Sequence, residues 1–132
     1  MPSLDRPAAK PRPVYLDLPR IRMPIPSVVS FLHRVTGALM LLFGIPLLLY
    51  AVSASLASRE SWGALEAALA HPLAKLLLIA AAWAFLHHLC AGIRHLLLDV
   101  QVGVELAPAR RSSVVVFVVS LALTLVVGMK LW

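Results

Sequence analysis

The chain alternates between long apolar stretches and short polar segments. Three stretches have no charged residue, and these are Val35–Ser58, Leu76–Ile93 and Ser112–Met129. Each is 18 to 24 residues long, and a helix needs about 20 apolar residues to cross a bilayer. Backbone groups in hydrocarbon have to pair within their own segment, which favours helices. The pattern therefore predicts an all-α integral membrane protein with three transmembrane helices.

Proline and polar residues delimit the predicted helices. The first 26 residues contain seven prolines, which prevent a continuous helix, so residues 1–26 are expected to form an irregular arm. Ser27 is a suitable helix cap, and Pro46 is expected to kink the first helix. The transmembrane domain is expected over residues 27–131, with helices over about 27–57, 72–99 and 112–131 and a short surface helix over 61–70.

Composition and charge support a membrane location and give its orientation. Charged residues make up 14% of the chain, against about 25% in a soluble domain. A net charge of +6 would suit nucleic-acid binding, but the basic residues gather before the first span and between the second and third. Basic residues mark the cytoplasmic side of membrane proteins, so we expect a cytoplasmic N-terminus and an external C-terminus. The arm lacks the apolar core of a secretory signal. A bacterial inner membrane fits best, with a mitochondrial one as the alternative.

The second span carries a stripe of polar residues. His88, Gly92, His95 and Asp99 are spaced i, i+4, i+7 and i+11, which places them on one helix face. His87 points about 100° away, so the adjacent histidines cannot serve the same ligand. At 1.5 Å per residue, His88 lies about 16 Å from Asp99 along the axis, near the middle of a hydrocarbon layer about 30 Å thick.

A neutral histidine at this depth needs a partner. Haem iron is a common partner, and a hydrogen bond to a neighbouring helix is the alternative. His88 and His95 are about 10.5 Å apart along the axis, too far to share an iron. His33 is expected about 9 Å deep in the first helix, above the level of His88. If His88 binds haem, another subunit should therefore supply the opposite ligand.

The entry of the first helix is also polar. Ser27, Ser30 and Arg34 are spaced i, i+3 and i+7 on one face, with His33 beside them. Both polar clusters lie at the cytoplasmic ends of their helices, so they can meet in space. A guanidinium there suits a haem propionate, and serine and arginine can both donate to a quinone carbonyl. The alternative is that Arg34 reaches the lipid headgroups and the serines cap the helix.

Two runs of sequence resemble the signatures of one family. The run SFLHRVTG at residues 30–37 resembles the S-x-x-H-R-x-S/T-G signature of the cytochrome b subunit of succinate dehydrogenase. The run HLCAGIRHLLLD at residues 88–99 is similar to that family's second signature, H-x-x-x-G-x-R-H-x-x-x-D. The segment RPVYLDL at residues 12–18 looks like its R-P-V-x-L-D-L opening, and the resemblance covers nearly the whole chain.

The resemblance implies a membrane-anchor subunit that works in a complex and is not an enzyme on its own. It implies a second three-helix subunit, with a haem b between the two, and flavoprotein and iron–sulfur subunits held on the cytoplasmic face. His88 would be an axial haem ligand, and the partner subunit would supply the second. Ser30 and Arg34 would line the ubiquinone site, and His33 and Arg34 would lie near the haem propionates. The implied activity is electron transfer from succinate, through iron–sulfur clusters, to ubiquinone.

Two other functions compete with this interpretation. An anchor of a related fumarate reductase would run the same couple in the opposite direction. A small transporter or assembly scaffold would use its histidines to relay protons or to bind another helix. A b-type absorption band that depends on His88 discriminates the haem-binding anchors from the transporter or scaffold.

Overall fold

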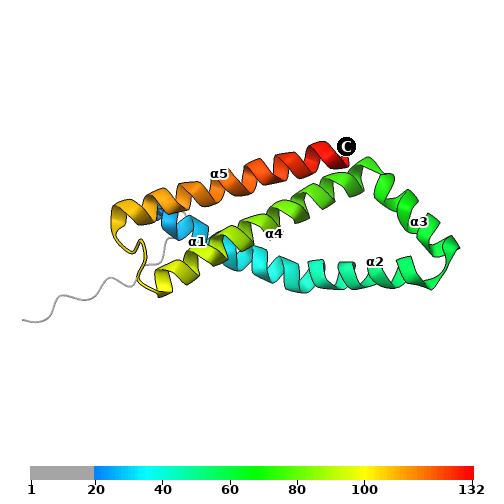
Figure 1. Ribbon diagram of the computed structural model, residues 1–132, viewed down its shortest axis with the longest axis horizontal. Coiled ribbons are helices and arrows are strands. Elements are labelled where there is room, and N and C mark those ends of the chain that lie inside the picture. Colours follow the sequence, from blue (N-terminus) through cyan, green and yellow to red (C-terminus); the bar gives the residue numbers. More distant parts are fainter. Residues whose placement is uncertain (1–19) are drawn as a thin grey trace, which may run out of the picture.

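A computed structural model of the chain describes residues 20–132 (Figure 1). Most of the predicted arm, residues 1–19, lies outside the described part. Within that part the chain is helical and has no strand, and three helices are long and apolar enough to cross a membrane. The predicted all-α, three-span class is therefore confirmed. The elements in chain order are α1 Ile25–Leu39, the π-helical segment η2 Met40–Gly44, α2 Ile45–Ala57, α3 Arg59–Ala70, α4 Pro72–Asp99 and α5 Leu106–Leu131.

The first span is one continuous helix from Ile25 to Ala57, formed by α1, η2 and α2. Pro46 has no N–H to donate to the preceding turn, and the wider π turn of η2 lies directly before it. Such single π turns accommodate an interrupted hydrogen-bond ladder, and Figure 1 shows the axis changing direction between α1 and α2. The helix begins two residues earlier than expected. Pro24 occupies the cap position, and Ser27 lies inside the first turn and does not cap the helix.

A short helix, α3, links the first span to the second. Ser58 and Ser61 form a reciprocal capping box, in which the Ser58 hydroxyl accepts from the Ser61 N–H at 3.1 Å and the Ser61 hydroxyl accepts from the Ser58 N–H at 3.0 Å. This cap satisfies two backbone donors at the helix start. It also explains why α3 begins at Arg59, two residues before the predicted surface helix.

The second and third spans, α4 and α5, are joined by a tight turn. α4 ends at Asp99, and the turn uses Gln101 and Gly103, both with positive φ. α5 starts at Leu106, six residues before the expected start. Pro108 is tolerated there because the N–H groups of a first helical turn have no intrahelical partner.

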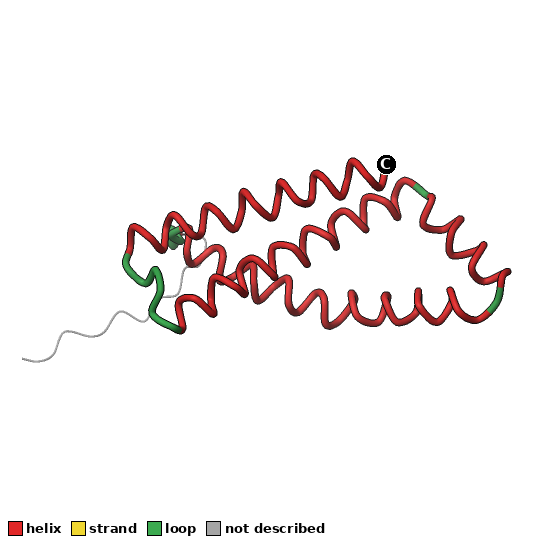
Figure 2. The backbone as a smooth tube through the Cα atoms, viewed as in Figure 1, coloured by secondary structure: helices red, strands yellow, loops and turns green. Residues whose placement is uncertain are grey.

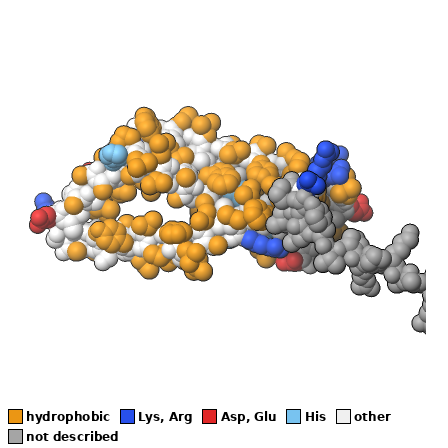
Figure 3. Space-filling model, turned by 180° about the vertical axis from the view of Figure 1, so that it is seen from behind, with side chains coloured by type: hydrophobic (Ala, Val, Ile, Leu, Met, Phe, Trp, Pro, Cys, Tyr) orange, Lys and Arg blue, Asp and Glu red, His pale blue; other side chains and the backbone are white. Residues whose placement is uncertain are grey.

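Only three of the five α-helices pack together closely. α4 lies against α5 and α1 (Figure 2), around a small buried core of Val29, Ala91 and Val116. α2 contacts η2 and α3 but neither α4 nor α5. Figure 3, with side chains drawn, shows an opening through this part of the molecule. Large apolar side chains stay exposed along the spans, as expected for surfaces that meet lipid or other subunits.

Candidate functional site

The two adjacent histidines of α4 face different elements. His87 is fully buried, with its ring 5.3 Å from those of Trp83 and of Phe117 on α5. Neither nitrogen of His87 makes a hydrogen bond within residues 20–132. His88 faces α1 instead and is only half-buried. A group bound beside this chain can therefore approach His88 but not His87.

The contacts of His88 define which of its nitrogens carries the proton. Nδ1 lies 2.9 Å from the backbone carbonyl oxygen of His33 and 3.3 Å from the Thr36 hydroxyl. A carbonyl can only accept, so Nδ1 is the donor and Nε2 keeps its lone pair. Within the described residues no hydrogen bond forms at Nε2. Metal-ligating histidines are typically held in this way, with the second ring nitrogen donating to a carbonyl.

His33 joins the polar clusters of α1 and α4. Its ring stacks on that of His88 with centroids 4.0 Å apart and lies 5.0 Å from that of His95. The predicted meeting of the two clusters is therefore observed. The His33 ring lies between those of His88 and His95, with its Nε2 beside Gly92, one turn beyond His88. This agrees with the expectation that His33 lies above the level of His88.

The stacking also bears on metal binding. Two imidazoles on opposite sides of one iron have nitrogens about 4 Å apart, by analogy with zinc–nitrogen bonds, and the rings extend beyond them. In this chain the ring centroids of His33 and His88 are themselves 4.0 Å apart and nearly parallel. These two side chains therefore do not bracket one iron. Within the described residues no group of three histidine, cysteine or acidic side chains could hold a metal ion.

Ser30 and Arg34 lie one turn apart on α1 and are both accessible at its surface. Ser30 is half-buried and Arg34 is exposed. Several other serine and threonine hydroxyls in the spans donate to a carbonyl of the preceding turn, as Thr36 and Ser113 do. Neither Ser30 nor Arg34 makes a side-chain hydrogen bond within residues 20–132. Their donors are available to a ligand at this end of the spans.

Arg94 has a structural environment that the sequence did not reveal. It is buried in α4, where its Nε donates to the Ser112 hydroxyl at 3.0 Å and a terminal nitrogen donates to the Ala109 carbonyl at 3.4 Å. Both acceptors belong to the start of α5. The guanidinium therefore connects the end of the second span to the beginning of the third.

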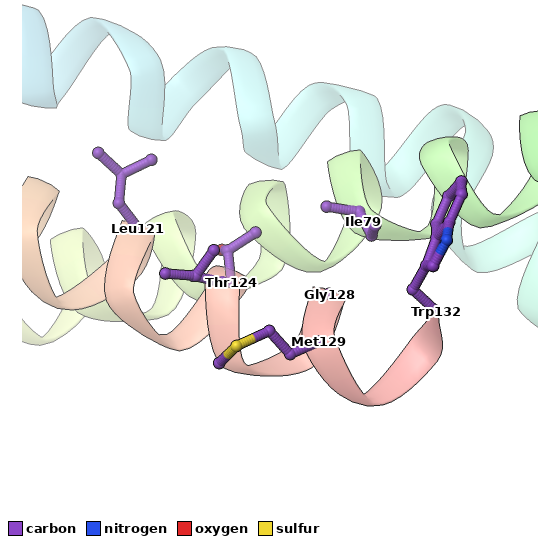
Figure 4. A pocket seen from close by; sticks show the side chains of 7 residues that line it. Ile79, Leu121, Thr124, Gly128, Met129 and Trp132 are labelled. Carbon is purple, nitrogen blue, oxygen red and sulfur yellow. The ribbon is translucent and has the colours of Figure 1, made fainter.

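An apolar groove between α4 and α5 lies away from the histidines (Figure 4). It has a volume of about 470 Å³, and Thr124 is its one polar side chain. Ile79, Gly128 and Trp132 lie along it, on the side where the chain ends. The residues that line the groove include no group suited to acid–base or metal chemistry.

Comparisons with known proteins identify the family of the chain. A family model described as the succinate dehydrogenase/fumarate reductase transmembrane subunit matches residues 8–127. The chain is also similar to three bacterial proteins named succinate dehydrogenase cytochrome b556 subunit. That of Coxiella burnetii is 35% identical over 125 residues, which cover 92% of this chain and 97% of the relative.

The other two relatives are comparably similar. The protein of Paracoccus denitrificans is 32% identical over 102 residues, covering 77% of this chain and 78% of the relative. That of Rickettsia felis is 32% identical over 121 residues, covering 92% and 90%. The family match includes the first two spans, most of the third and both polar clusters. This chain therefore belongs to the family of succinate dehydrogenase/fumarate reductase transmembrane subunits.

Proposed function

We propose that this chain is the haem b- and quinone-binding anchor subunit of a bacterial succinate dehydrogenase. It holds the flavoprotein and iron–sulfur subunits at the cytoplasmic face of the inner membrane and helps electrons from succinate to reach ubiquinone. The family match supports an anchor in either a succinate dehydrogenase or a fumarate reductase. The names of the three relatives favour succinate dehydrogenase.

His88 carries the haem part of the proposal. With Nδ1 donating to the His33 carbonyl at 2.9 Å, Nε2 presents its lone pair at mid-depth of the second span. A buried neutral imidazole in hydrocarbon is costly without a partner, and iron would satisfy this nitrogen. A b-type haem with two histidine ligands supplies one-electron storage and transfer when bound. His33 and Arg34 would lie near its propionates.

The second axial ligand is proposed to come from a partner membrane subunit. His33 stacks on His88 and does not oppose it, and His95 is two turns further along α4. Within the described residues no other histidine lies beside this face. The half-exposed position of His88 is compatible with a haem held between two subunits.

Ser30 and Arg34 carry the quinone part of the proposal. Their free donors lie one turn apart on α1, at the end of the spans where the histidines gather. Reduction places negative charge on the quinone oxygens, and a hydroxyl and a guanidinium donate hydrogen bonds that stabilise this charge. These residues bind and orient the quinone. Its protons and remaining contacts come largely from partner subunits.

The experiment that tests the proposal is a reduced-minus-oxidised spectrum of the purified membrane complex. The wild-type complex should show a b-type band, and His88→Ala should lose it while the subunits remain together. His71→Ala, at the opposite end of α4, is the matched control and should keep the band. A His88→Ala complex with a wild-type spectrum would refute the ligand assignment.

A further inference from the structure

A small cradle on α1 holds the His88 imidazole. It consists of the His33 carbonyl, the Thr36 hydroxyl and the bare backbone at Gly37. We propose that Thr36 and Gly37 are positioning residues for the haem ligand, in that Thr36 keeps the proton on Nδ1 and Gly37 lets the ring reach the α1 backbone. This inference rests on the proposed function, because it concerns how the iron-binding nitrogen is presented.

The hydroxyl of Thr36 acts on His88 as an acceptor. Thr36 is almost fully buried, with 1% of its surface exposed. Its single proton is directed to its own helix, at 2.8 Å from the Leu32 carbonyl and 3.1 Å from that of His33. The lone pairs of Oγ1 are then what faces His88 Nδ1 at 3.3 Å. Nδ1 therefore has two acceptors around it, and with the proton on Nε2 the lone pair of Nδ1 would face both of them with no hydrogen to donate.

Gly37 provides the space that this contact needs. A Cβ at position 37 would lie 2.8 Å from Cε1 of His88 and 3.3 Å from Nδ1. Any side chain there would push the ring away from α1, which lengthens the Nδ1 contacts and displaces Nε2. Position 37 is also one turn after His33, so a side chain would cover the carbonyl that Nδ1 uses. Glycine is the residue that permits such close approach to a backbone.

The cradle has a chemical consequence for bound iron. A hydrogen bond from the second ring nitrogen raises the basicity of a histidine ligand, and a more basic ligand favours the ferric state. Removing one of the two acceptors should therefore raise the reduction potential of the haem. Substituting a residue that hydrogen-bonds to a metal ligand typically lowers metal affinity by about 10- to 100-fold.

Thr36 is tested with two substitutions in the complete membrane complex. Thr36→Val removes the hydroxyl and keeps the shape of the side chain. The preference of the site for ferric over ferrous haem should then fall roughly tenfold, which raises the reduction potential of the haem by about 59 mV for a one-electron couple. Thr36→Ser keeps the hydroxyl and should stay close to wild type. The readouts are a redox titration of the b-type band and the electron paramagnetic resonance signal of the oxidised haem. An unchanged potential in Thr36→Val, or equal shifts in both variants, overturns the role of Thr36.

Gly37 is tested against a second glycine of the same span. Gly37→Ala should weaken haem binding by about tenfold or more, which is measured as a lower haem content of the purified complex. Gly44→Ala meets only ordinary contacts, with the nearest atom of Met40 at 3.6 Å, and should keep full haem content. A Gly37→Ala complex with wild-type haem content and spectrum overturns the role of Gly37. If Gly37→Ala prevents assembly, the two Thr36 variants decide the proposal.

Different experimental outcomes refute the role of the cradle and the proposed function. A complex that keeps its haem in His88→Ala refutes His88 as the ligand and the cradle with it. If His88→Ala loses haem but neither Thr36→Val nor Gly37→Ala has an effect, the assignment of His88 as the ligand stands and only the cradle is refuted.

Discussion

At the scale of single residues, the adjacent histidines of α4 have opposite surroundings. His88 has a carbonyl and a hydroxyl around Nδ1, whereas His87 lies between Trp83 and Phe117 with neither nitrogen bonded among the described residues. A buried polar group without a partner costs about 1–3 kcal/mol. His87 therefore fills space between helices, whereas His88 keeps the lone pair of Nε2 for a ligand.

The first prediction follows from that contrast. His87→Phe keeps an aromatic ring of similar size and removes two unbonded nitrogens, so the melting temperature of the complex should stay equal or rise. The b-type band should be retained, because His87 points away from the cradle. Thermal unfolding and a difference spectrum measure both. If His87→Phe loses the band and His88→Ala keeps it, His87 is the haem ligand and His88 is not.

The second prediction at this scale concerns Arg34, whose guanidinium is exposed and forms no hydrogen bond within residues 20–132. Arg34→Ala should lower quinone reduction by roughly tenfold or more, since hydrogen bonds to a charged group contribute about 1.5–3 kcal/mol. Succinate oxidation with an artificial acceptor should persist. Arg59→Ala, an exposed arginine at the far end of the span, is the matched control. Equal loss of both activities in Arg34→Ala would argue against a quinone contact.

At the scale of elements, the sequence predicted the spans better than their ends and contacts. Long apolar stretches identify the helices because hydrocarbon imposes them, and α4 has the bounds expected from the pattern. The early start of α5 was missed because Pro108 and the two arginines before Ser112 read as a loop, although a first helical turn accepts them. Thr36 and Gly37 were not singled out, because their importance depends on the crossing of α1 and α4, which periodicity does not give.

Arg94 gives the prediction that belongs to this scale. Ser112→Ala removes the hydroxyl that accepts from Nε of this buried guanidinium and should destabilise the complex by about 1–3 kcal/mol. Ser53→Ala makes the same change at an exposed position on α2 that has no hydrogen bond among the described residues, and should leave stability unchanged. Thermal unfolding of the two variants measures the difference. Equal melting temperatures would mean that Arg94 does not hold α5 to α4.

At the scale of the whole molecule, the described part of the chain buries few of its own apolar side chains. Its buried apolar core comprises Val29, Ala91 and Val116, and α2 diverges from α4 and α5 (Figure 1). A membrane protein gains little from apolar burial between helices, since lipid is equally apolar. The packed part is instead the end where α1, α4 and α5 converge, which is also where the histidines lie. The described helices are therefore packed most closely around the site that a partner is proposed to complete.

Orientation across the membrane is a property of the whole chain, and it gives the last prediction. The structure brings Trp132 next to Lys75, with the ammonium 5.6 Å from the indole ring, so the C-terminus lies at the end of the spans opposite the histidine cluster. Nine of the twelve basic residues belong to the arm, the ends of α1 and α4 near the histidine cluster and the start of α5, and basic residues remain on the cytoplasmic side. Alkaline phosphatase fused after Trp132 should therefore be active, and the same enzyme fused at Gly103 should be inactive. Green fluorescent protein at the same two positions should give the reverse pattern, because it fluoresces only when it folds in the cytoplasm. If both reporters are reversed, the histidine cluster faces outside, and a cytoplasmic succinate-oxidising partner cannot deliver electrons to it.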